Sequence, residues 1–438
     1  ATIDDLEALK LVRKTPLTAA QMKSDEELVE DVNHLMPRSD WQTLDNPLHA
    51  FKRLAKGARI TKPKHIFLIV GESIPQWSMD PLYMDFNICP GLRRFAADTH
   101  TACVPNFLPA GNVSRPSISS LMSGIYDSGM ELNEKEMFWN NTLPTALAAQ
   151  IKRLGYQTIY WYGGNSSSGN FTKYGKAQGF DRIENATEFC GLQAPQTWLG
   201  VYDYVFLEEA AKRIVNMDEP TFHFVYTTTN HGPYKLEDKY LDFDAHRDLP
   251  GVGDDILNRK DGNKGLATYK YCDKAIFDFV DAMKAKFPDS LFIVTGDHSN
   301  LFGEFNNTSF LHRGYTMREI RNNVFYMQHP ELSQTSLPAS IGTHLSIMPT
   351  IIEAIAPKGF EYYAAVPSAF DEQPDVYVTP YQWITSDMVR DVHGDYGQYQ
   401  TYTAEPSEYI RPIDNHAQDA EYWRSLSAWM MKFYANVQ

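Results

Sequence analysis

The sequence predicts an α/β protein with a mostly parallel central sheet covered by helices on both faces, followed by a small C-terminal α+β subdomain. Three observations predict it. Short, almost continuous apolar runs alternate with helical stretches, which is typical of buried parallel strands. The 438 residues suit one large domain with a small appendage. The composition, 43% hydrophobic and 22% charged, is that of a globular protein and excludes the disordered and fibrous classes.

The apolar runs place the expected strands at residues 65–70, 157–162, 221–227 and 291–295. Helical patterns between them predict long helices at residues 143–154, 204–215 and 269–286. In sheets of this kind, ligands bind beyond the carboxyl ends of the strands. Functional side chains are therefore expected among the residues that directly follow each strand.

The ends of the chain differ from this central part. Residues 1–60 are interpreted as a polar, acidic helical segment with a linker, residues 61–360 as the catalytic domain, and residues 361–438 as a C-terminal subdomain. The basic stretch 52–64 is interpreted as a solvated helix end and linker, with a patch for anionic lipid as the alternative. Trp423, Leu426, Met430 and Phe433 predict an amphipathic helix that packs on the main domain.

The net charge of −15 excludes a general nucleic-acid binder. Cys89, Cys103, Cys190 and Cys272 form no C-x-x-C pair, so no zinc knuckle is expected, and disulfides or free thiols both remain open. The longest apolar runs have the length of strands, so no membrane span is predicted. The start of the chain does not read as a signal segment, which suggests a soluble protein or an excised domain.

Two of the expected strands are followed by residues that can bind a metal ion. Glu72 comes after the first strand, in Gly-Glu-Ser, and Asp297 and His298 come after the fourth, in Gly-Asp-His-Ser. Carboxylate and imidazole ligands together suit a single zinc or manganese ion. The pair of motifs therefore predicts one divalent metal site.

Ser114 lies in a small polar cluster that opens an apolar helix. The positive end of a helix favours an anion, and a metal-bound serine hydroxyl is a nucleophile toward phosphorus. The alternative is that Ser114 only caps the helix. Ser117 and Thr101 are weaker candidates, because Ser117 lies inside the helix and Thr101 has no helix start beside it.

Three histidines stand near these motifs. His231 follows the third strand, in Asn-His-Gly-Pro, and His312 follows His298 in Leu-His-Arg-Gly. Both are candidates for the active site. His344 precedes an apolar helix and is interpreted as structural.

The ordered motifs GES, SRPSISSLMSG, TTTNHGPY, GDHS and LH resemble the sulfatase-like branch of the alkaline phosphatase superfamily. Within it the chain is most similar to lipoteichoic acid synthases and phosphoethanolamine transferases. The resemblance implies the metal ligands Glu72, Ser114, Asp297 and His298, with Ser114 as the nucleophile. It implies that His231 and His312 hold the phosphoryl group or transfer protons. Arg115, Tyr162 and Asn170 are expected to join these two histidines in binding substrate.

The implied function is transfer of a phosphoglycerol or phosphoethanolamine head group from a phospholipid to a hydroxyl of a glycan, lipid or polymer. The implied place is outside the cytoplasm, in the periplasm or on the outer face of a bacterial cytoplasmic membrane, near the membrane surface and as the soluble domain of an anchored protein. Thr is the usual nucleophile in those transferases, and Ser114 keeps the hydroxyl.

Other functions stay open at this point. With water as the acceptor, the same site would be a phosphodiesterase or a phosphonate ester hydrolase. A sulfatase would need formylglycine at residue 114, but Ile118 replaces an arginine of that motif, and Glu72 stands where sulfatases carry two aspartates. A non-catalytic extracellular binding domain is the alternative outside the enzymes. The complete set of ligand residues argues against it.

Overall fold

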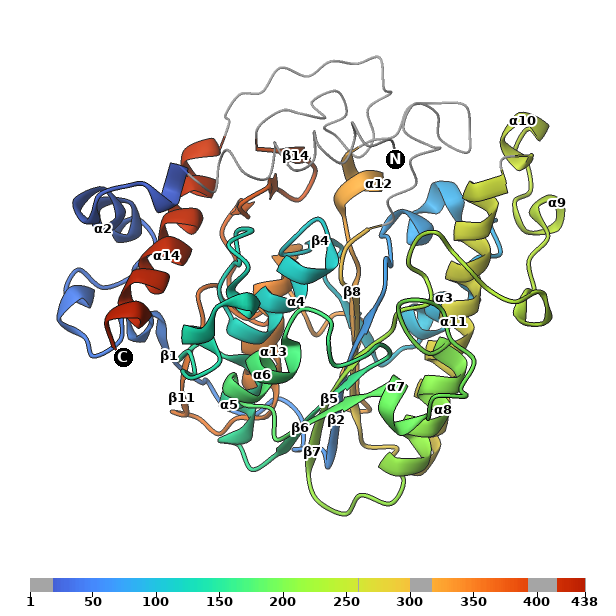
Figure 1. The fold of residues 1–438 in the computed structure, drawn as a ribbon, viewed down its shortest axis with the longest axis horizontal. Coiled ribbons are helices and arrows are strands. Elements are labelled where there is room, and N and C mark those ends of the chain that lie inside the picture. The colour runs from blue at the N-terminus through green and yellow to red at the C-terminus, as the bar shows by residue number, and fades with distance from the viewer. Residues whose placement is uncertain (1–18, 259, 300–316, 393–415, 438) are drawn as a thin grey trace.

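The computed structural model of the chain describes residues 19–258, 260–299, 317–392 and 416–437. Its centre is a seven-stranded sheet with the strand order β3-β9-β8-β2-β7-β5-β6 (Figure 1). All pairs along β8-β2-β7-β5-β6 are parallel, and β9 is antiparallel to both of its neighbours. The strands are β2 (His65–Gly71), β3 (Thr101–Cys103), β5 (Gln157–Tyr162), β6 (Arg182–Asn185), β7 (Thr221–Tyr226), β8 (Leu291–Gly296) and β9 (Phe325–Gln328).

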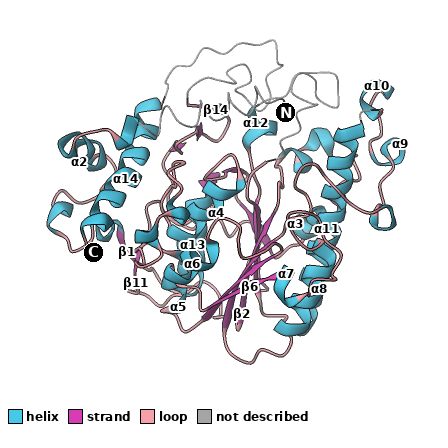
Figure 2. Cartoon of the chain, viewed as in Figure 1, coloured by secondary structure: helices cyan, strands magenta, loops and turns pink. Residues whose placement is uncertain are grey.

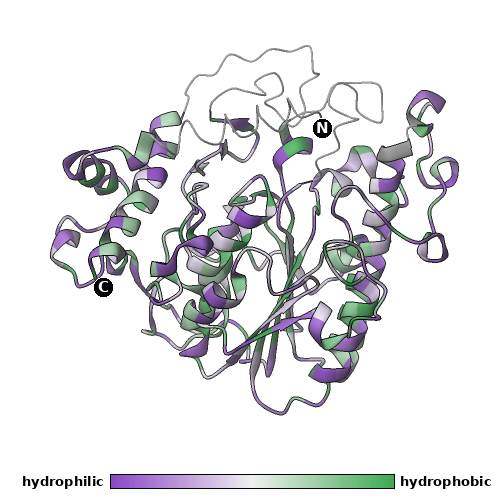
Figure 3. Ribbon diagram, viewed as in Figure 1, coloured by the Kyte–Doolittle hydropathy of each residue, from purple (hydrophilic) through white to green (hydrophobic). Residues whose placement is uncertain are grey.

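Helices cover both faces of this sheet, as predicted (Figures 1 and 2). Alternate residues of β2 point to opposite faces: Ile66 and Leu68 belong to one buried cluster, and Phe67 and Ile69 belong to the other. The first cluster includes residues of α4 (Ser114–Ser123), α5 (Leu147–Lys152), α6 (Phe171–Ala177) and α13 (Ile347–Ile355). The second includes residues of α3 (Pro90–Ala97), α8 (Asp203–Ile214) and α11 (Lys260–Lys286). Figure 3 shows the apolar residues concentrated in the strands and on the helix faces toward them.

Two of the three predicted helices have boundaries that differ from the prediction by more than one residue. α11 begins at Lys260, well before the expected residue 269, because Gly262 and Gly265 weaken the helical pattern of its first turns. α5 begins at Leu147, later than the expected residue 143, because the backbone of Ala146 is extended. The four predicted strands are confirmed to within one residue at each end.

The first and last described segments lie side by side (Figure 1). α14 (Ala417–Asn436) packs on α2 (Asp25–Asn33), with the ring of Tyr422 stacked on that of His34. β1 (Lys52–Leu54) pairs with β11 (Glu361–Tyr363), and β12 (Tyr377–Val378), β13 (Gln382–Ile384) and β14 (Val389–Asp391) form a small antiparallel sheet. Trp423, Leu426 and Met430 of α14 are buried, as its amphipathic pattern predicted, and Phe433 is partly buried against the same core cluster.

Shorter strands, helices and 3-10 turns connect these elements. β4 (Asn106–Leu108) and β10 (Ile341–Thr343) form a separate parallel pair, which leads into α4 on one side and α13 on the other. The remaining helices are short: α7 (Ala186–Phe189), α9 (Ala245–Asp248), α10 (Asp254–Leu257) and α12 (Met317–Arg321). In the part of the chain that the structure describes, no helix combines the length and the apolar character that crossing a membrane requires.

The basic stretch 52–64 directly follows a 3-10 turn, Pro47–Phe51. It contains β1 and an extended segment, and its cations are matched by acidic side chains: Lys52 lies 2.9 Å from Glu361, and Lys56 lies 2.5 Å from Asp371. Arg59 donates to the backbone carbonyl of Glu353 at 2.9 Å. Cations paired in this way contribute little net positive charge to a lipid surface.

Candidate active site

The two motifs with acidic residues meet at the carboxyl end of the central sheet. The last residues of β2 and β8, Gly71 and Gly296, are paired in a parallel register. The amide of Asp297 donates to the carbonyl of Gly71 at 3.1 Å. Glu72 and Asp297 therefore leave the sheet side by side, although 225 positions separate their motifs in the sequence.

Three ligand-type side chains form a buried cluster there. Glu72, Asp297 and His298 are 1%, 0% and 5% exposed, and one ligand atom of each lies within 4.8 Å of the others. Nε2 of His298 is 3.4 Å from Glu72 Oε1 and 3.4 Å from Asp297 Oδ2. Nδ1 of His298 lies 2.7 Å from the carbonyl of Ser299, which can only accept, so Nδ1 carries a proton and Nε2 faces the carboxylates.

The charges in this cluster favour a cation. Burial and the charge of Glu72 raise the pKa of Asp297 to about 6. Burial also acts to raise the pKa of Glu72, but the hydrogen bond and charge of His298 outweigh it and lower that pKa to about 2. Two buried carboxylates this close repel each other unless a positive charge lies between them. The donor set of two carboxylates and one imidazole fits a divalent ion such as zinc or manganese.

Hydrogen bonds fix the orientation of both carboxylates. The backbone amides of Ser73 and His298 each donate to Asp297 Oδ1 at 2.8 Å. The hydroxyl of Ser73 donates to Glu72 Oε1 at 2.8 Å. Asp297 Oδ2 and Glu72 Oε2 are thereby directed to the same side, where Tyr226 lies. Groups that orient ligands in this way increase the affinity of a metal site.

Tyr226, the last residue of β7, belongs to the site but was not predicted from the sequence. Its hydroxyl lies 2.8 Å from Asp297 Oδ2 and 3.1 Å from Glu72 Oε2, so one O–H is shared between the two carboxylates. Burial and the neighbouring carboxylates raise the pKa of Tyr226 well above its usual value, so the hydroxyl keeps its proton. Because Tyr226 lies in an apolar strand, the sequence pattern predicts a core residue at this position.

Replacing Tyr226 by phenylalanine is expected to lower the affinity for zinc or manganese about 10- to 100-fold, the usual effect of losing a group that orients metal ligands. The phenylalanine ring keeps the stacking on Tyr162, whose ring centroid is 5.4 Å away, so the fold should persist. Calorimetric titration of chelator-treated protein measures the effect. Tyr160→Phe, at another buried tyrosine of the sheet, is the matched control. Equal affinity in Tyr226→Phe and wild-type protein would contradict this role.

Ser114 is the first residue of α4, and its hydroxyl faces the cluster. Ser114 Oγ lies 3.3 Å from Glu72 Oε2 and 3.3 Å from His298 Nε2. The cap residue of α4 is Val113, so the alternative that Ser114 is an N-cap is wrong. The turn that brings Ser114 here is tight, because a Cβ on Gly111 would lie 2.8 Å from the Pro116 ring.

The two other hydroxyls considered as nucleophiles are bonded elsewhere. Ser117 is fully buried and donates to the carbonyl of Gly111 at 2.9 Å, a bond to the preceding turn as the sequence suggested. Thr101 lies in β3, where its hydroxyl accepts from Gln328 at 2.8 Å. Among the three candidate hydroxyls, that of Ser114 has these contacts with the ligand-type residues.

Arg115 and Asn170 are linked by a residue that the sequence analysis missed, Glu134. The amide of Asn170 donates to Glu134 Oε2, and Arg115 Nη1 lies 3.9 Å from Glu134 Oε1. The Arg115 side chain is 58% exposed and follows Ser114 directly, so its guanidinium is open to solvent beside the cluster. Glu134 lies in a short 3-10 turn without a recognisable motif, which leaves no signal for it in the sequence.

His231 stands at the edge of the site. The preceding residue, Asn230, donates to the backbone carbonyl of Glu72 at 3.0 Å and fixes the loop there. Nδ1 of His231 donates to the carbonyl of Gly232 at 2.6 Å, so Nε2 is left for other partners. The ring of Trp198 packs edge-on against that of His231, with centroids 5.5 Å apart, and Trp198 is 64% exposed. Trp198 thus extends the site outward. His312 lies outside the described residues.

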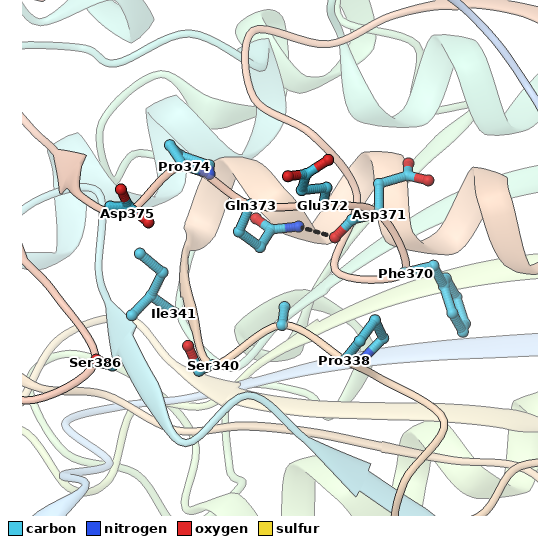
Figure 4. Close-up of a pocket in the computed structure, with 11 residues that line it drawn as sticks. Pro338, Ser340, Ile341, Phe370, Asp371, Glu372, Gln373, Pro374, Asp375 and Ser386 are labelled. Atoms are coloured by element: carbon cyan, nitrogen blue, oxygen red, sulfur yellow. Dashed lines mark hydrogen bonds between the residues drawn. The ribbon is translucent and has the colours of Figure 1, made fainter.

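A separate pocket of about 440 Å³ lies at the start of β10 (Figure 4). Asp371, Glu372 and Asp375 line it together with the residues just before β10, and none of the ligand-type residues does. One of its carboxylates, that of Asp371, is already paired with Lys56. We do not assign the chemistry to this pocket. The four cysteines of the chain are all free thiols.

Comparison with known proteins places the chain in a family. The Sulfatase family model matches residues 64–355, more than half of the chain. Lipoteichoic acid synthase from Staphylococcus aureus (strain USA300) is 23% identical over 290 residues, which are 65% of this chain and 42% of that protein. The chain thus aligns with less than half the length of this curated relative.

Solved structures show the same fold. A protein of the alkaline phosphatase superfamily from Vibrio parahaemolyticus has a TM-score of 0.66 at 16% identity and covers 94% of this chain and 97% of its own. The lipoteichoic acid synthase LtaP from Listeria monocytogenes has a TM-score of 0.65 at 13% identity, with 93% and 97% covered. The C-terminal periplasmic domain of EcEptC from Escherichia coli has a TM-score of 0.54 at 15% identity, with 81% and 99% covered.

The match extends from the start of β2 to the end of α13 and so includes every strand and helix that carries the cluster. The motifs, the mixed seven-stranded sheet and the structural neighbours agree with one another. The chain therefore belongs to the Sulfatase family of enzymes, has an alkaline phosphatase-like fold, and is homologous to lipoteichoic acid synthase.

Proposed function

We propose that the chain is the catalytic domain of a metal-dependent phosphotransferase that moves a phosphoglycerol or phosphoethanolamine head group from a phospholipid through a phospho-serine intermediate. The observation that carries the proposal is the Ser114 hydroxyl at 3.3 Å from both Glu72 and His298, at the first residue of a helix. Both halves of this arrangement suit an attack on phosphorus, because the helix start attracts an anion and the acidic cluster suits a cation.

Glu72, Ser114, Asp297 and His298 would hold one divalent ion, zinc or manganese. The domain of EcEptC has also been solved as a complex with Zn, at a TM-score of 0.54. When bound, such an ion supplies a lowered pKa at a coordinated hydroxyl and neutralises negative charge on phosphoryl oxygens.

In the first half-reaction, Ser114 Oγ forms a bond to phosphorus, and the bond between phosphorus and the diacylglycerol oxygen breaks. The Ser114 proton leaves to solvent, which a lowered pKa at the coordinated hydroxyl would permit. In the second half-reaction an acceptor hydroxyl attacks phosphorus, the bond to Oγ breaks, and Ser114 regains a proton. If water takes the place of the acceptor, the same steps describe a phosphodiesterase.

The remaining residues would act on the substrate. The guanidinium of Arg115, next to Ser114 and largely exposed, suits a phosphoryl oxygen or an anionic part of the donor. Nε2 of His231 is available to bind a phosphoryl oxygen or to protonate the departing oxygen. Tyr162 and Asn170 would complete the wall of the site, and His312 is proposed as a second histidine at the phosphoryl group. Acceptors would be hydroxyls of a glycan, lipid or polymer outside the cytoplasm, close to a membrane surface.

A sulfatase activity is less well supported. It would need formylglycine at residue 114 and an arginine at residue 118, where Ile118 is 1% exposed in the apolar core. Intact-protein mass spectrometry separates the two functions, because conversion of serine to formylglycine removes two hydrogens.

The function is tested with the purified protein and vesicles that contain phosphatidylglycerol or phosphatidylethanolamine as the only labelled lipid. Release of diacylglycerol that stops with a chelator and returns with manganese or zinc supports the proposal, and the preferred vesicle identifies the head group. Hydrolysis of a sulfate ester without diacylglycerol release would overturn it. Hydrolysis of a chromogenic phosphodiester without transfer would replace the transferase with a phosphodiesterase.

Replacing His231 by alanine is expected to lower turnover about 100- to 10,000-fold, the usual cost of losing a proton-transfer or charge-stabilising group. Metal content should stay at the wild-type level, because His231 is not in the ligand cluster. Elemental analysis and diacylglycerol release on the same sample measure both quantities. His246→Ala, in α9, is a control for the loss of an imidazole. Loss of metal in His231→Ala would make this residue a metal ligand.

A further inference from the structure

His344 joins the two segments that carry the nucleophile and the metal ligands. It follows β10 directly and is 1% exposed. The amide of Ala110 donates to His344 Nδ1 at 3.0 Å, and His344 Nε2 lies 2.9 Å from the carbonyl of Gly296. Because an amide can only donate and a carbonyl can only accept, Nδ1 is the acceptor and Nε2 carries the proton. Burial lowers the pKa of His344 to about 3, which agrees with a neutral ring.

Both partners of His344 lie immediately before residues of the candidate active site. Ala110 opens the turn that ends at Ser114, and Gly296 precedes Asp297. The Gly296 segment has little freedom, because the Asn323 amide forms two bonds to its backbone, at 2.9 and 2.7 Å. A Cβ at Gly296 would lie 2.8 Å from Asn323 Oδ1. Because Asp297 follows Gly296 directly, a change in the position of this backbone would move Asp297.

We propose that His344 is a positioning residue that fixes the distance between the Ser114 hydroxyl and the metal ligands Asp297 and His298. A neutral imidazole accepts at one nitrogen and donates at the other in a rigid ring, so a single side chain holds the Ala110 turn and the Gly296 strand end at once. This role rests on the proposed function for its chemistry. The geometry that supports it is independent of any substrate.

Two substitutions of His344 each remove one of its two hydrogen bonds and keep the other. In His344→Asn the short amide can take the place of Nδ1 and accept from Ala110, but it does not reach Gly296. In His344→Gln the longer amide can take the place of Nε2 and donate to Gly296, but it leaves Ala110 without its acceptor. His223→Asn is the matched control. Like His344, His223 is fully buried, and it lies in β7 of the central sheet, where its ring is hydrogen-bonded to His65 at 2.9 Å and to Trp161 at 3.0 Å.

The readouts are the affinity of chelator-treated protein for Zn²⁺ alone, the turnover of a chromogenic phosphodiester at saturating metal, and thermal unfolding. His344→Asn is expected to bind Zn²⁺ about 10- to 100-fold more weakly, with turnover largely restored at saturating metal. His344→Gln is expected to keep the affinity within about threefold and to lose on the order of 100-fold in turnover, the effect of a small displacement of a reacting group. His223→Asn should lose stability and keep both properties.

Wild-type affinity and turnover in both His344 variants would overturn the proposal, and so would losses that the His223 control shares. If a variant does not fold, hydrogen exchange of the unmodified protein decides instead. Addition of Zn²⁺ should then slow hydrogen exchange at the Ala110 amide, and unchanged exchange there would contradict the positioning role of His344. If the wild-type protein binds Zn²⁺ but cleaves no phosphodiester, the proposed function fails, whereas the contrast in Zn²⁺ affinity between the two variants still tests His344.

Discussion

Ser114→Ala is expected to abolish turnover, with a loss on the order of 10⁴-fold or more, because the atom that forms the bond to phosphorus is removed. Ser114→Thr should retain part of the activity, since threonine keeps the hydroxyl. Ser114 is only partly buried at the start of α4, so neither change should lower the stability by more than about 1 kcal/mol. Steady-state rates and thermal unfolding of the three proteins measure these effects.

Ser117→Ala is the matched control for this experiment. It removes a hydroxyl from the same helix, one turn further along, whose bond goes to Gly111 and not to the cluster. A slow phosphodiester donor should leave a phosphoryl adduct on the peptide that contains Ser114, and mass spectrometry of digested protein identifies the residue. An adduct on Ser117, or full activity in Ser114→Ala, would refute the proposed mechanism.

Asp297→Asn is expected to lower the affinity for zinc or manganese by at least about 100-fold, more than the loss of a supporting group. The structure explains why this change spares the fold. Oδ1 of Asp297 accepts from two backbone amides and is retained in asparagine, whereas Oδ2, 3.4 Å from His298 Nε2, is replaced by a nitrogen that cannot bind a cation. Metal content after dialysis and calorimetric titration measure the loss.

Asp273→Asn is the matched control for a buried carboxylate. Burial raises the pKa of Asp273 to about 7, and its oxygens accept from the amides of Gly91 and Leu92 at the start of α3. This variant should lose stability and keep its metal. Unchanged metal stoichiometry in Asp297→Asn would remove Asp297 from the ligand set.

The proximity of the three ligand-type side chains could be predicted because its signal in the sequence is local. Glu72, Asp297 and His298 directly follow apolar strands, and parallel strands bring such positions to one edge of a sheet. Ser114 was found from the polar cluster that opens an apolar helix. In each case the candidate residue lies next to a strand or helix that the sequence pattern predicts.

The parts of the site that sequence analysis missed depend on packing across distant segments. Tyr226 lies inside an apolar strand, so its sequence pattern predicts only a core residue. The structure places its hydroxyl between two carboxylates. Trp198 and Glu134 lie in irregular segments that the fold brings to the site. His344 was interpreted as structural, and only its two bonds show which segments it joins. The helix starts of α5 and α11 were misplaced because propensity is a weak guide near glycine and extended backbone.

The central position of β2 has a consequence for folding. β2 is synthesised early, but its two partners, β7 and β8, lie much later in the chain. Ile66 can therefore pair with Phe222 and Leu291 only after those residues have been synthesised. Pairings between such distant residues carry a large loop-closure cost and are slow to form. A nascent or truncated chain that ends before β8 therefore exposes one whole edge of β2, a hazard for aggregation. We expect the domain to fold only once β8 has been synthesised, so that Glu72 and Asp297 come together only after that point.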